Sequence, residues 1–279
     1  MFTGVAGERA RAQLAGGRFA DVRWVAETGS TNADALALAR DGAPEGIVLV
    51  ADHQTAGRGR RDRQWEAPPG AGLLVSILLR PPATVVATAT MAVAVAAAEA
   101  IEAIAGARPG LKWPNDLVWP GDGSAPDRKL AGILAEAEWP PGADVASGPR
   151  QPGPGERAVV VVGIGINVSW PDDLPEHLAE TAIALNHVTD AVVDREDLLA
   201  AMLQRLDHHD RQVRADGPEA LLAEWRARSA TLGRRVRVDL GADDIVGTAV
   251  DVTAAGHLVV DADEGGRKVV AVGDVVHLR

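Results

Sequence analysis

HQTAGRGRRDRQW, residues 53–65, concentrates positive charge in a chain whose formal net charge is −11. Glycine lets the backbone adopt unusual φ values and approach a ligand closely. Arginine binds phosphate or carboxylate through paired N–H donors. The segment is therefore a phosphate-binding loop, a nucleic-acid patch or an ordinary charged turn. Its glycines and arginines, called the arginine loop below, are Gly57, Arg58, Gly59, Arg60, Arg61 and Arg63.

The arginine loop lies between two predicted strands, residues 47–54 and 72–80, which are short apolar runs. Further strands are predicted over residues 111–119, with a break at Pro114, and over 158–168; residues 129–139 are predicted as a strand, with a helix as the alternative. Helices are predicted over 29–42, 84–105 and 194–230, and Thr31 with Asp34 fits a capping box at the start of the first. This mixture of elements predicts an α+β main domain.

The pattern changes after residue 230. From Arg234 onward the chain consists of short alternating apolar and polar runs separated by Gly and Asp turns, which is typical of a small β-barrel of SH3-like size. We therefore expect a main domain over residues 1–230 and a C-terminal domain over 231–279. Residues 140–156 are rich in Pro and Gly, and we expect an exposed, mobile connection there.

Composition excludes several classes of function. The chain has no cysteine, so disulfides, thiolate metal sites and a cysteine nucleophile are ruled out. The N-terminus lacks the apolar core of a signal peptide. The most apolar run, residues 90–106, is interrupted by Glu99 and Glu102 and falls short of a membrane span. We expect a cytoplasmic protein without a membrane partner, and the negative net charge argues against duplex DNA as a general partner.

Three further motifs carry groups suited to phosphate chemistry. KWPNDLVW (112–119) contains Lys112, Asn115 and Asp116, of which Asp116 could bind magnesium, although an Asn-Asp pair beside Pro is commonly just a turn. Lys129 begins an apolar strand and could present a compact charge to a carboxylate or phosphate, or simply face solvent. GIGIN (163–167) lacks the third glycine of a dinucleotide fingerprint, so Asn167 is a candidate polar contact instead.

Taken in order along the chain, these motifs resemble biotin protein ligase (biotin–acetyl-CoA-carboxylase ligase). The resemblance rests on GSTN (29–32), QTAGRGRRDRQW (54–65), KWPNDL (112–117), KLAGIL (129–134) and GIGINV (163–168), and it extends from about Trp24 to Arg279. It implies a class II synthetase-like catalytic domain on a mixed sheet, followed by an SH3-like domain. It also implies an AMP-forming enzyme that makes biotinyl-5′-AMP from biotin and MgATP, then transfers biotin to a lysine of a biotin carboxyl carrier domain.

The resemblance further implies roles for individual residues. Lys129, Arg60, Asp116 and Lys112 would be catalytic, with Asp116 as the candidate Mg²⁺ ligand. Glycines 132, 163 and 165 would leave room for the ligand. The residues expected to bind biotin are Ser30, Thr31, Gln54, Gly57, Arg58, Arg60, Lys129 and Gly132. The residues expected to bind ATP or the adenylate are Asn32, Arg60, Arg61, Arg63, Trp65, Lys112, Asn115, Lys129 and Asn167.

Some family members carry an N-terminal helix-turn-helix domain. Only 28 residues precede GSTN here, so we expect a dedicated ligase without DNA binding. Some members form homodimers through an edge strand, and the sequence leaves that option open. Two alternatives to biotin ligation also stay open at this point: lipoate or octanoate ligation on the same fold, and a nucleic-acid-binding regulator that uses the arginine loop.

Overall fold

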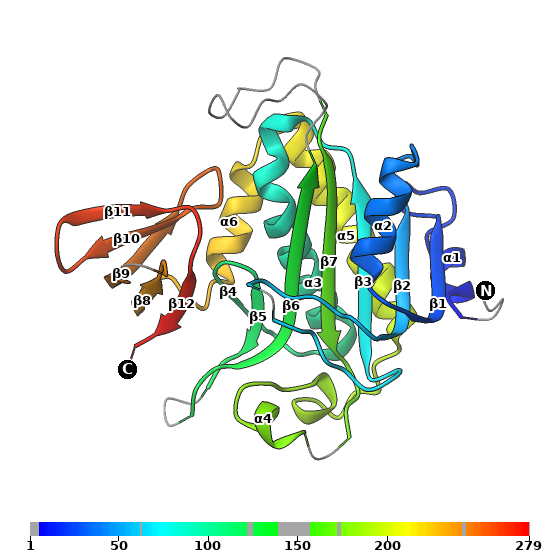
Figure 1. The fold of residues 1–279 in the computed structure, drawn as a ribbon, viewed down its shortest axis with the longest axis horizontal. Coiled ribbons are helices and arrows are strands. Elements are labelled where there is room, and N and C mark those ends of the chain that lie inside the picture. The colour runs from blue at the N-terminus through cyan, green and yellow to red at the C-terminus, as the bar shows by residue number, and fades with distance from the viewer. Residues whose placement is uncertain are drawn as a thin grey trace.

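The computed structural model describes residues 6–61, 63–121, 125–138, 157–171, 174–241 and 244–278. The predicted connection at 140–156 lies outside these residues. Two β-sheets organise the chain, a large one with helices on both faces and a small one at the C-terminal end (Figure 1).

The large sheet has seven strands in the order β1-β2-β3-β7-β6-β5-β4. β1 and β2 are parallel and the other pairs are antiparallel, so the predicted mixed sheet is confirmed. The described part of the predicted segment, residues 129–138, forms a strand rather than a helix. The strands are β1 (Val22–Thr28), β2 (Val48–Gln54), β3 (Gly72–Leu79), β4 (Gly110–Lys112), β5 (Asp116–Trp119), β6 (Arg128–Glu138) and β7 (Val159–Asn167).

Helix α2 (Thr31–Arg40) covers part of one sheet face. On the opposite side lie three further helices, of which the first two contact the sheet and the third packs against those two (Figure 1). These are α3 (Ala89–Ala105), preceded by the 3-10 turn η1 (Ala83–Thr88), α5 (Arg195–Asp216) and α6 (Glu219–Ala227). The short helices α1 (Glu8–Gln13), α4 (Glu176–Ala179) and η3 (Leu185–His187) were not predicted. The helix predicted over 194–230 is divided at Gly217, because Pro218 follows it.

Two details of these helices differ from expectation: the length of the most apolar stretch and the cap of α2. The stretch Val85–Ala105 is long and apolar enough to cross a membrane by length and composition, but about two-thirds of it is buried between the sheet and α5, as expected of a core helix. The capping box was also misplaced. The N-cap of α2 is Ser30, whose side chain makes no cap hydrogen bond, and Asp34 instead accepts a hydrogen bond from Thr28 Oγ1 at 2.6 Å.

The C-terminal sheet has five antiparallel strands in the order β11-β10-β9-β8-β12. It has its own apolar interior, which includes Val236, Val238 and Val260, and it lies beside the β4–β5 end of the large sheet (Figure 1). This bears out the small C-terminal β-domain. Its strands are β8 (Arg235–Asp239), β9 (Asp244–Val252), β10 (Leu258–Ala262), β11 (Gly266–Val270) and β12 (Asp274–His277).

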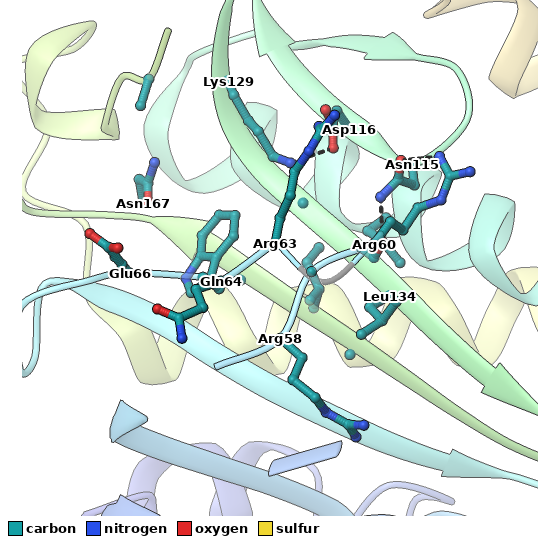
Figure 2. Close-up of a pocket in the computed structure, with 18 of the residues that line it drawn as sticks. Arg58, Arg60, Arg63, Gln64, Glu66, Asn115, Asp116, Lys129, Leu134 and Asn167 are labelled. Carbon is teal, nitrogen blue, oxygen red and sulfur yellow. Dashed lines mark hydrogen bonds and ion pairs between the residues drawn. The ribbon is translucent and has the colours of Figure 1, made fainter. Parts of the chain in front are cut away.

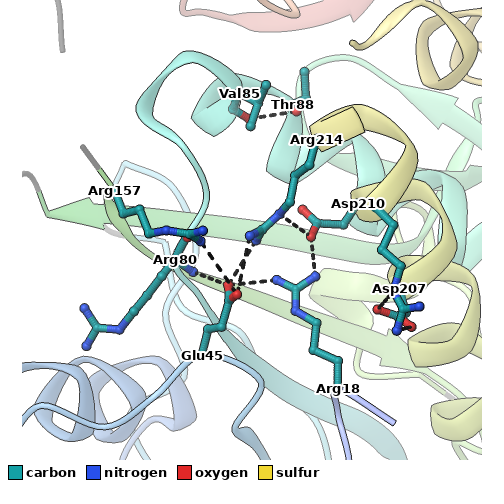
Figure 3. Close-up of polar contacts among 10 residues, drawn as sticks. Arg18, Glu45, Arg80, Val85, Thr88, Arg157, Asp207, Asp210 and Arg214 are labelled. Carbon is teal, nitrogen blue, oxygen red and sulfur yellow. Dashed lines mark hydrogen bonds and ion pairs between the residues drawn. The ribbon is translucent and has the colours of Figure 1, made fainter. Parts of the chain in front are cut away.

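A cluster of charged side chains joins several elements at the end of the sheet where β3 stops and β7 begins (Figure 3). Glu45 is its centre: one carboxylate oxygen accepts hydrogen bonds from Arg18 Nη2 at 2.9 Å, Arg214 Nη2 at 3.0 Å and the backbone N–H of Arg80 at 2.9 Å. Asp210 binds Arg18 and Arg214 in turn. Burial opposes ionisation of Glu45, but these donors outweigh it and hold the pKa of the carboxyl below its usual value.

We expect Glu45→Gln to lower the free energy of unfolding at pH 7 by about 1–3 kcal/mol, because charge-assisted hydrogen bonds are lost from a largely buried site. Folding lowers the pKa of the Glu45 carboxyl, so the ionised group stabilises the folded protein at pH values above its unfolded pKa of about 4.3. That contribution is lost as the pH falls through the pKa of the folded protein. Urea unfolding should therefore show the difference between the two proteins shrinking below about pH 4. A difference that persists unchanged at pH 3 would contradict this, and Glu27→Gln, at an exposed carboxylate, is the control.

Candidate functional site

A pocket of about 510 Å³ opens on the sheet face that carries α2. Its floor follows a row of paired residues across four strands: Lys112 on β4, Asp116 on β5, Gly132 on β6 and Gly165 on β7. Two of these four are glycines, so the floor is hollow where side chains would otherwise project. The walls are completed by Arg58, Gly59, Arg60 and Arg63 of the arginine loop and by Asp274 and Val275 of β12. The site therefore lies between the two sheets.

Lys129 reaches this pocket because β6 is irregular. Strict alternation along the strand would place Lys129 and Gly132 on opposite faces. A register shift between Leu117 and Val118 of the partner strand places Leu130 and Ala131 together in the core and turns Lys129 onto the pocket face. A bulge that redirects a side chain in this way is common beside active sites. Lys129 Nζ there lies 2.7 Å from Asp116 Oδ1.

The indole of Trp65 lies over the glycines of the floor. A Cβ atom at Gly165 would come within 2.5 Å of the Trp65 ring, and one at Gly132 would meet both Lys129 and Trp65 at 3.0 Å or less. Lys129 Nζ sits 5.6 Å from the centre of the same ring. The expected clearance at these two glycines is therefore occupied by Trp65. The clearance at Gly163 is occupied by Asn32.

The closed end of the pocket is built from buried polar groups beside the start of α2. Gln54 Oε1 accepts hydrogen bonds from the backbone N–H of Thr31 at 2.8 Å and from its hydroxyl at 3.0 Å. Ser76 Oγ lies 2.7 Å from Thr31 Oγ1 and donates to Asn32 Oδ1 at 2.6 Å. Ser30 also lines this end. The result is an uncharged, hydrogen-bonding cavity end, suited to a ligand head group with its own donors and acceptors.

Three arginines of the loop contact the C-terminal sheet instead of pointing into empty space. Asp274 pairs with Arg60 at 3.2 Å, Arg61 at 3.3 Å and Arg63 at 2.8 Å. Arg61 also pairs with Asp239 at 3.0 Å. The backbone N–H of Gly241, together with Arg61, holds the pKa of Asp239 below its usual value. These partly exposed ion pairs place three arginine side chains at the edge of the pocket. A bound polyanion could compete with the carboxylates for these arginines.

The remaining motif residues frame the same edge. Arg60 Nη1 donates to Asn115 Oδ1 at 3.3 Å, and Figure 2 shows the two side chains meeting beside Asp116. Lys112 lies towards the C-terminal sheet. Burial lowers the pKa of His277 on β12, and the charge of Lys112 lowers it further. The KWPND motif and β12 are thus electrostatically coupled.

Among the described residues, three buried polar atoms of the pocket wall lack both a hydrogen-bond and an ion-pair partner, and the indole N–H of Trp170 is one of them. The Trp65 indole N–H donates to nothing, and Asn167 Oδ1 accepts nothing, although Asn167 Nδ2 donates to Ile183 O at 3.0 Å. Burying an unpaired donor or acceptor costs free energy unless a ligand or water completes it. These atoms therefore point to a ligand with complementary polar groups.

The pocket offers a magnesium ion a candidate carboxylate ligand, that of Asp116. Asp116 supplies a carboxylate, already close to Lys129. Within the described ranges, no group of three or more His, Cys, Asp or Glu side chains is arranged to hold a metal. Mg²⁺ in phosphate chemistry commonly takes one or two carboxylates plus phosphate oxygens. Asp116 fits that mode, in which the ion is held mainly by its nucleotide.

Most of the predicted site residues meet at this pocket. Gly57 and Arg61 do not line it: Gly57 O accepts the backbone N–H of Trp65 at 3.0 Å, and Arg61 turns to Asp239. Asn32, which is expected to bind the nucleotide together with Asn167, lies against Gly163 on β7. Sequence reasoning missed Ser76, Glu136 and Asp274. Only Ser76 gave a signal, as a polar residue inside an apolar strand. The predicted residues that line the pocket are Ser30, Thr31, Asn32, Gln54, Arg58, Arg60, Arg63, Trp65, Lys112, Asn115, Asp116, Lys129, Gly132, Gly163, Gly165 and Asn167.

Comparison with known proteins gives a consistent result. Residues 26–139 match the Biotin/lipoate A/B protein ligase family, and residues 231–278 match the Biotin protein ligase C terminal domain. A Mycobacterium tuberculosis biotin–[acetyl-CoA-carboxylase] ligase is 40% identical over 91% of this chain and 88% of its own length. A Paracoccus denitrificans protein of the same name is 33% identical over 90% and 98%. The Aquifex aeolicus biotin protein ligase structure, in complex with biotin and ATP, is 27% identical with a TM-score of 0.74, covering 94% of this chain and 100% of that one.

Proposed function

Because the chain belongs to the biotin protein ligase family, we propose that its pocket performs both half-reactions of an AMP-forming biotin ligase. In the first, a biotin carboxylate oxygen attacks the α-phosphorus of ATP, and pyrophosphate leaves. In the second, a lysine amine of a biotin carboxyl carrier domain attacks the carbonyl of biotinyl-5′-AMP, an amide forms, and AMP leaves. Neither step requires a protein nucleophile, in keeping with a chain that has no cysteine.

The observation that carries this proposal is the division of the pocket into an uncharged end and a cationic end. Thr31, Gln54 and Ser76 form a hydrogen-bonding end that suits the ureido head of biotin. Lys129, Arg60 and Arg63 lie at the other end, where the carboxylate and the phosphates would meet. A dithiolane head group would leave the polar end unpaired, which disfavours lipoate.

At the cationic end the chain's own residues offset charge repulsion. A carboxylate approaching a triphosphate is repelled, and positioned cations that stabilise the developing charge are the main means of catalysing phosphoryl-type transfer. Lys129 and Arg60 would take that role, with Arg63 and Lys112 nearer the leaving phosphates. Mg²⁺, held by ATP and Asp116, would add Lewis-acid stabilisation. Asn167 Oδ1, which accepts no hydrogen bond from the described residues, and Trp65 would meet the adenine side of the nucleotide.

The proposal is tested by incubating the protein with biotin, MgATP and a biotin carboxyl carrier domain. We expect avidin-reactive product that depends on the acceptor lysine, with release of pyrophosphate. Lipoate, added at increasing concentration, should compete poorly. An absence of avidin-reactive product would overturn the assignment, and tighter binding of lipoate than of biotin would reassign the substrate.

Several finer features belong to the same proposal. The carrier domain as acceptor, a cytoplasmic location, the absence of DNA binding and the division at residues 230/231 stay predictions. The start of β8 at Arg235, shortly after that boundary, supports the division. The edge strand β1 is the element through which a homodimer would extend the large sheet.

A further inference from the structure

Glu136 of β6 joins two parts of the site that are distant in sequence. Its Oε2 atom accepts a hydrogen bond from Asn32 Nδ2 at 2.8 Å and pairs with Arg58 Nη2 at 2.9 Å. The side chain of Glu136 is 26% exposed and that of Arg58 is 45% exposed. One carboxylate oxygen thus holds both the first turn of α2 and the beginning of the arginine loop.

The Asn32 side of this contact is rigid. Asn32 is buried, its Oδ1 accepts from Ser76, and its side chain lies so close to Gly163 that a Cβ there would come within 2.2 Å of Oδ1. Its amide orientation is therefore fixed by an acceptor on one side and a donor on the other. A continuous polar chain runs from Arg58 through Glu136, Asn32, Ser76 and Thr31 to Gln54.

The Arg58 side fixes the root of the loop. Arg58 forms an isolated antiparallel bridge with Gln64, so these residues close the base of the loop that contains Arg60 and Arg63. In Figure 2, Arg58 points away from Lys129 and Asp116, whereas Arg60 points toward Asn115. The loop is therefore held at its root by the large sheet and at its tip by Asp274 of the C-terminal sheet.

We propose that Glu136 is a positioning residue for the biotin end of the site. By holding Arg58 against β6, it sets the root of the arginine loop, and by orienting Asn32 it sets the hydrogen-bonding groups around Thr31 and Gln54. It touches no reacting atom. The inference rests on the proposed function for its kinetic consequence, but the placement of the loop can be tested without any ligand.

The decisive variant is Glu136→Gln, which keeps the size and an acceptor but removes the charge that holds Arg58. We expect the KM for biotin to rise roughly 5- to 20-fold, because a charge-assisted contact at a partly exposed site is lost. The kcat and the KM for ATP should stay within about twofold, because Asp274 still holds Arg60 and Arg63 at the tip of the loop. Trypsin should cleave the arginine loop of the ligand-free variant several-fold faster than that of the natural protein.

The matched control is Glu138→Gln, on the same strand and the same face, where Glu138 pairs with Arg40 away from the pocket. It should change neither the KM for biotin nor the cleavage rate. In an Arg58→Ala background, Glu136→Gln should raise the KM for biotin by less than twofold, because its partner is already gone. Equal increases of both KM values, or loop cleavage no faster than in Glu138→Gln, would overturn the proposal. If the natural protein formed no biotinyl-5′-AMP, the proposed function would fall, while the cleavage comparison would still decide whether Glu136 holds the loop.

Discussion

Replacing Lys129 by alanine should slow formation of biotinyl-5′-AMP about 100- to 1,000-fold, the usual loss when a positioned charge-stabilising group is removed. Lys129 is placed for this by the register shift in β6, which turns it onto the pocket face beside Asp116. Binding of biotin alone should weaken less than tenfold, because its ureido end would be held by the distant polar chain around Thr31 and Gln54. The effect should therefore appear in catalysis far more than in affinity.

The measurement is single-turnover pyrophosphate release at saturating biotin, beside calorimetric binding of biotin without ATP. Lys268→Ala is the matched control, since the chain has only three lysines, Lys112, Lys129 and Lys268, and Lys268 is exposed on β11. Equal losses in adenylate formation and in biotin binding would remove the role assigned to Lys129.

The ion pair between Lys129 and Asp116 allows a second test, in which both residues are replaced. Lys129→Ala would leave a carboxylate facing ATP without its cation, so part of the loss should come from repulsion. If Asp116 acts mainly as the counter-ion of Lys129, the double variant Lys129→Ala with Asp116→Ala should be faster than Lys129→Ala alone. If Asp116 also holds the magnesium ion, the double variant should be slower. The comparison decides between the two roles.

The centre of the fold could be predicted largely because its strands β3 and β7 are buried on both faces. Short, mainly apolar runs such as 72–80 and 158–168 are typical of interior strands, and the structure shows β3 and β7 paired at the centre of the sheet. The start of α2 could not be predicted from local pattern. Thr31 and Asp34 fit a capping box, but Gln54, which is 23 residues away, takes the first N–H of the helix. Tertiary contacts override local preference in such cases.

The functional site, like the fold, could be predicted only in part from the sequence. Lys129, Asn115 and the loop arginines lie in motifs, so their residue types alone suggest phosphate chemistry. Their partners lie in segments without a motif: Asp274 is separated from Arg63 by 211 residues, and Glu136 from Arg58 by 78. The bulge that redirects Lys129 could not be predicted from the sequence either, because it depends on the register of β5 against β6. Contacts between distant segments are set by topology, which no local pattern encodes.

Replacing Arg60 by glycine should release biotinyl-5′-AMP roughly 10- to 100-fold faster than the natural protein does, since a charge-assisted contact worth about 1.5–3 kcal/mol would be lost from the mixed anhydride. Arg60 is 25% exposed and extends from the loop to Asn115, Gly273 O and Asp274. It therefore links the loop to the C-terminal sheet at the wall of the pocket. A reactive acyl phosphate released into solution acylates amines without selection, so lysines of a bystander protein should become biotinylated.

Faster release of biotinyl-5′-AMP has two candidate physical causes, and a second variant distinguishes them. Arg60→Gly removes a contact with the ligand and also one of the links between the loop and β12. Asp274→Asn weakens all three ion pairs of the loop with β12 but leaves Arg60 in place. If release of the adenylate is controlled by the ligand contact, only Arg60→Gly should label bystander lysines. If it is controlled by closure of the loop on the C-terminal sheet, both variants should label them, because the loop then opens and admits water and amines.

Arg267→Gly, at an exposed arginine paired with Asp261, controls for the loss of surface charge. A dissociation rate of biotinyl-5′-AMP that is unchanged in Arg60→Gly would exclude both explanations, and the retention of the intermediate would then have to come from Lys129.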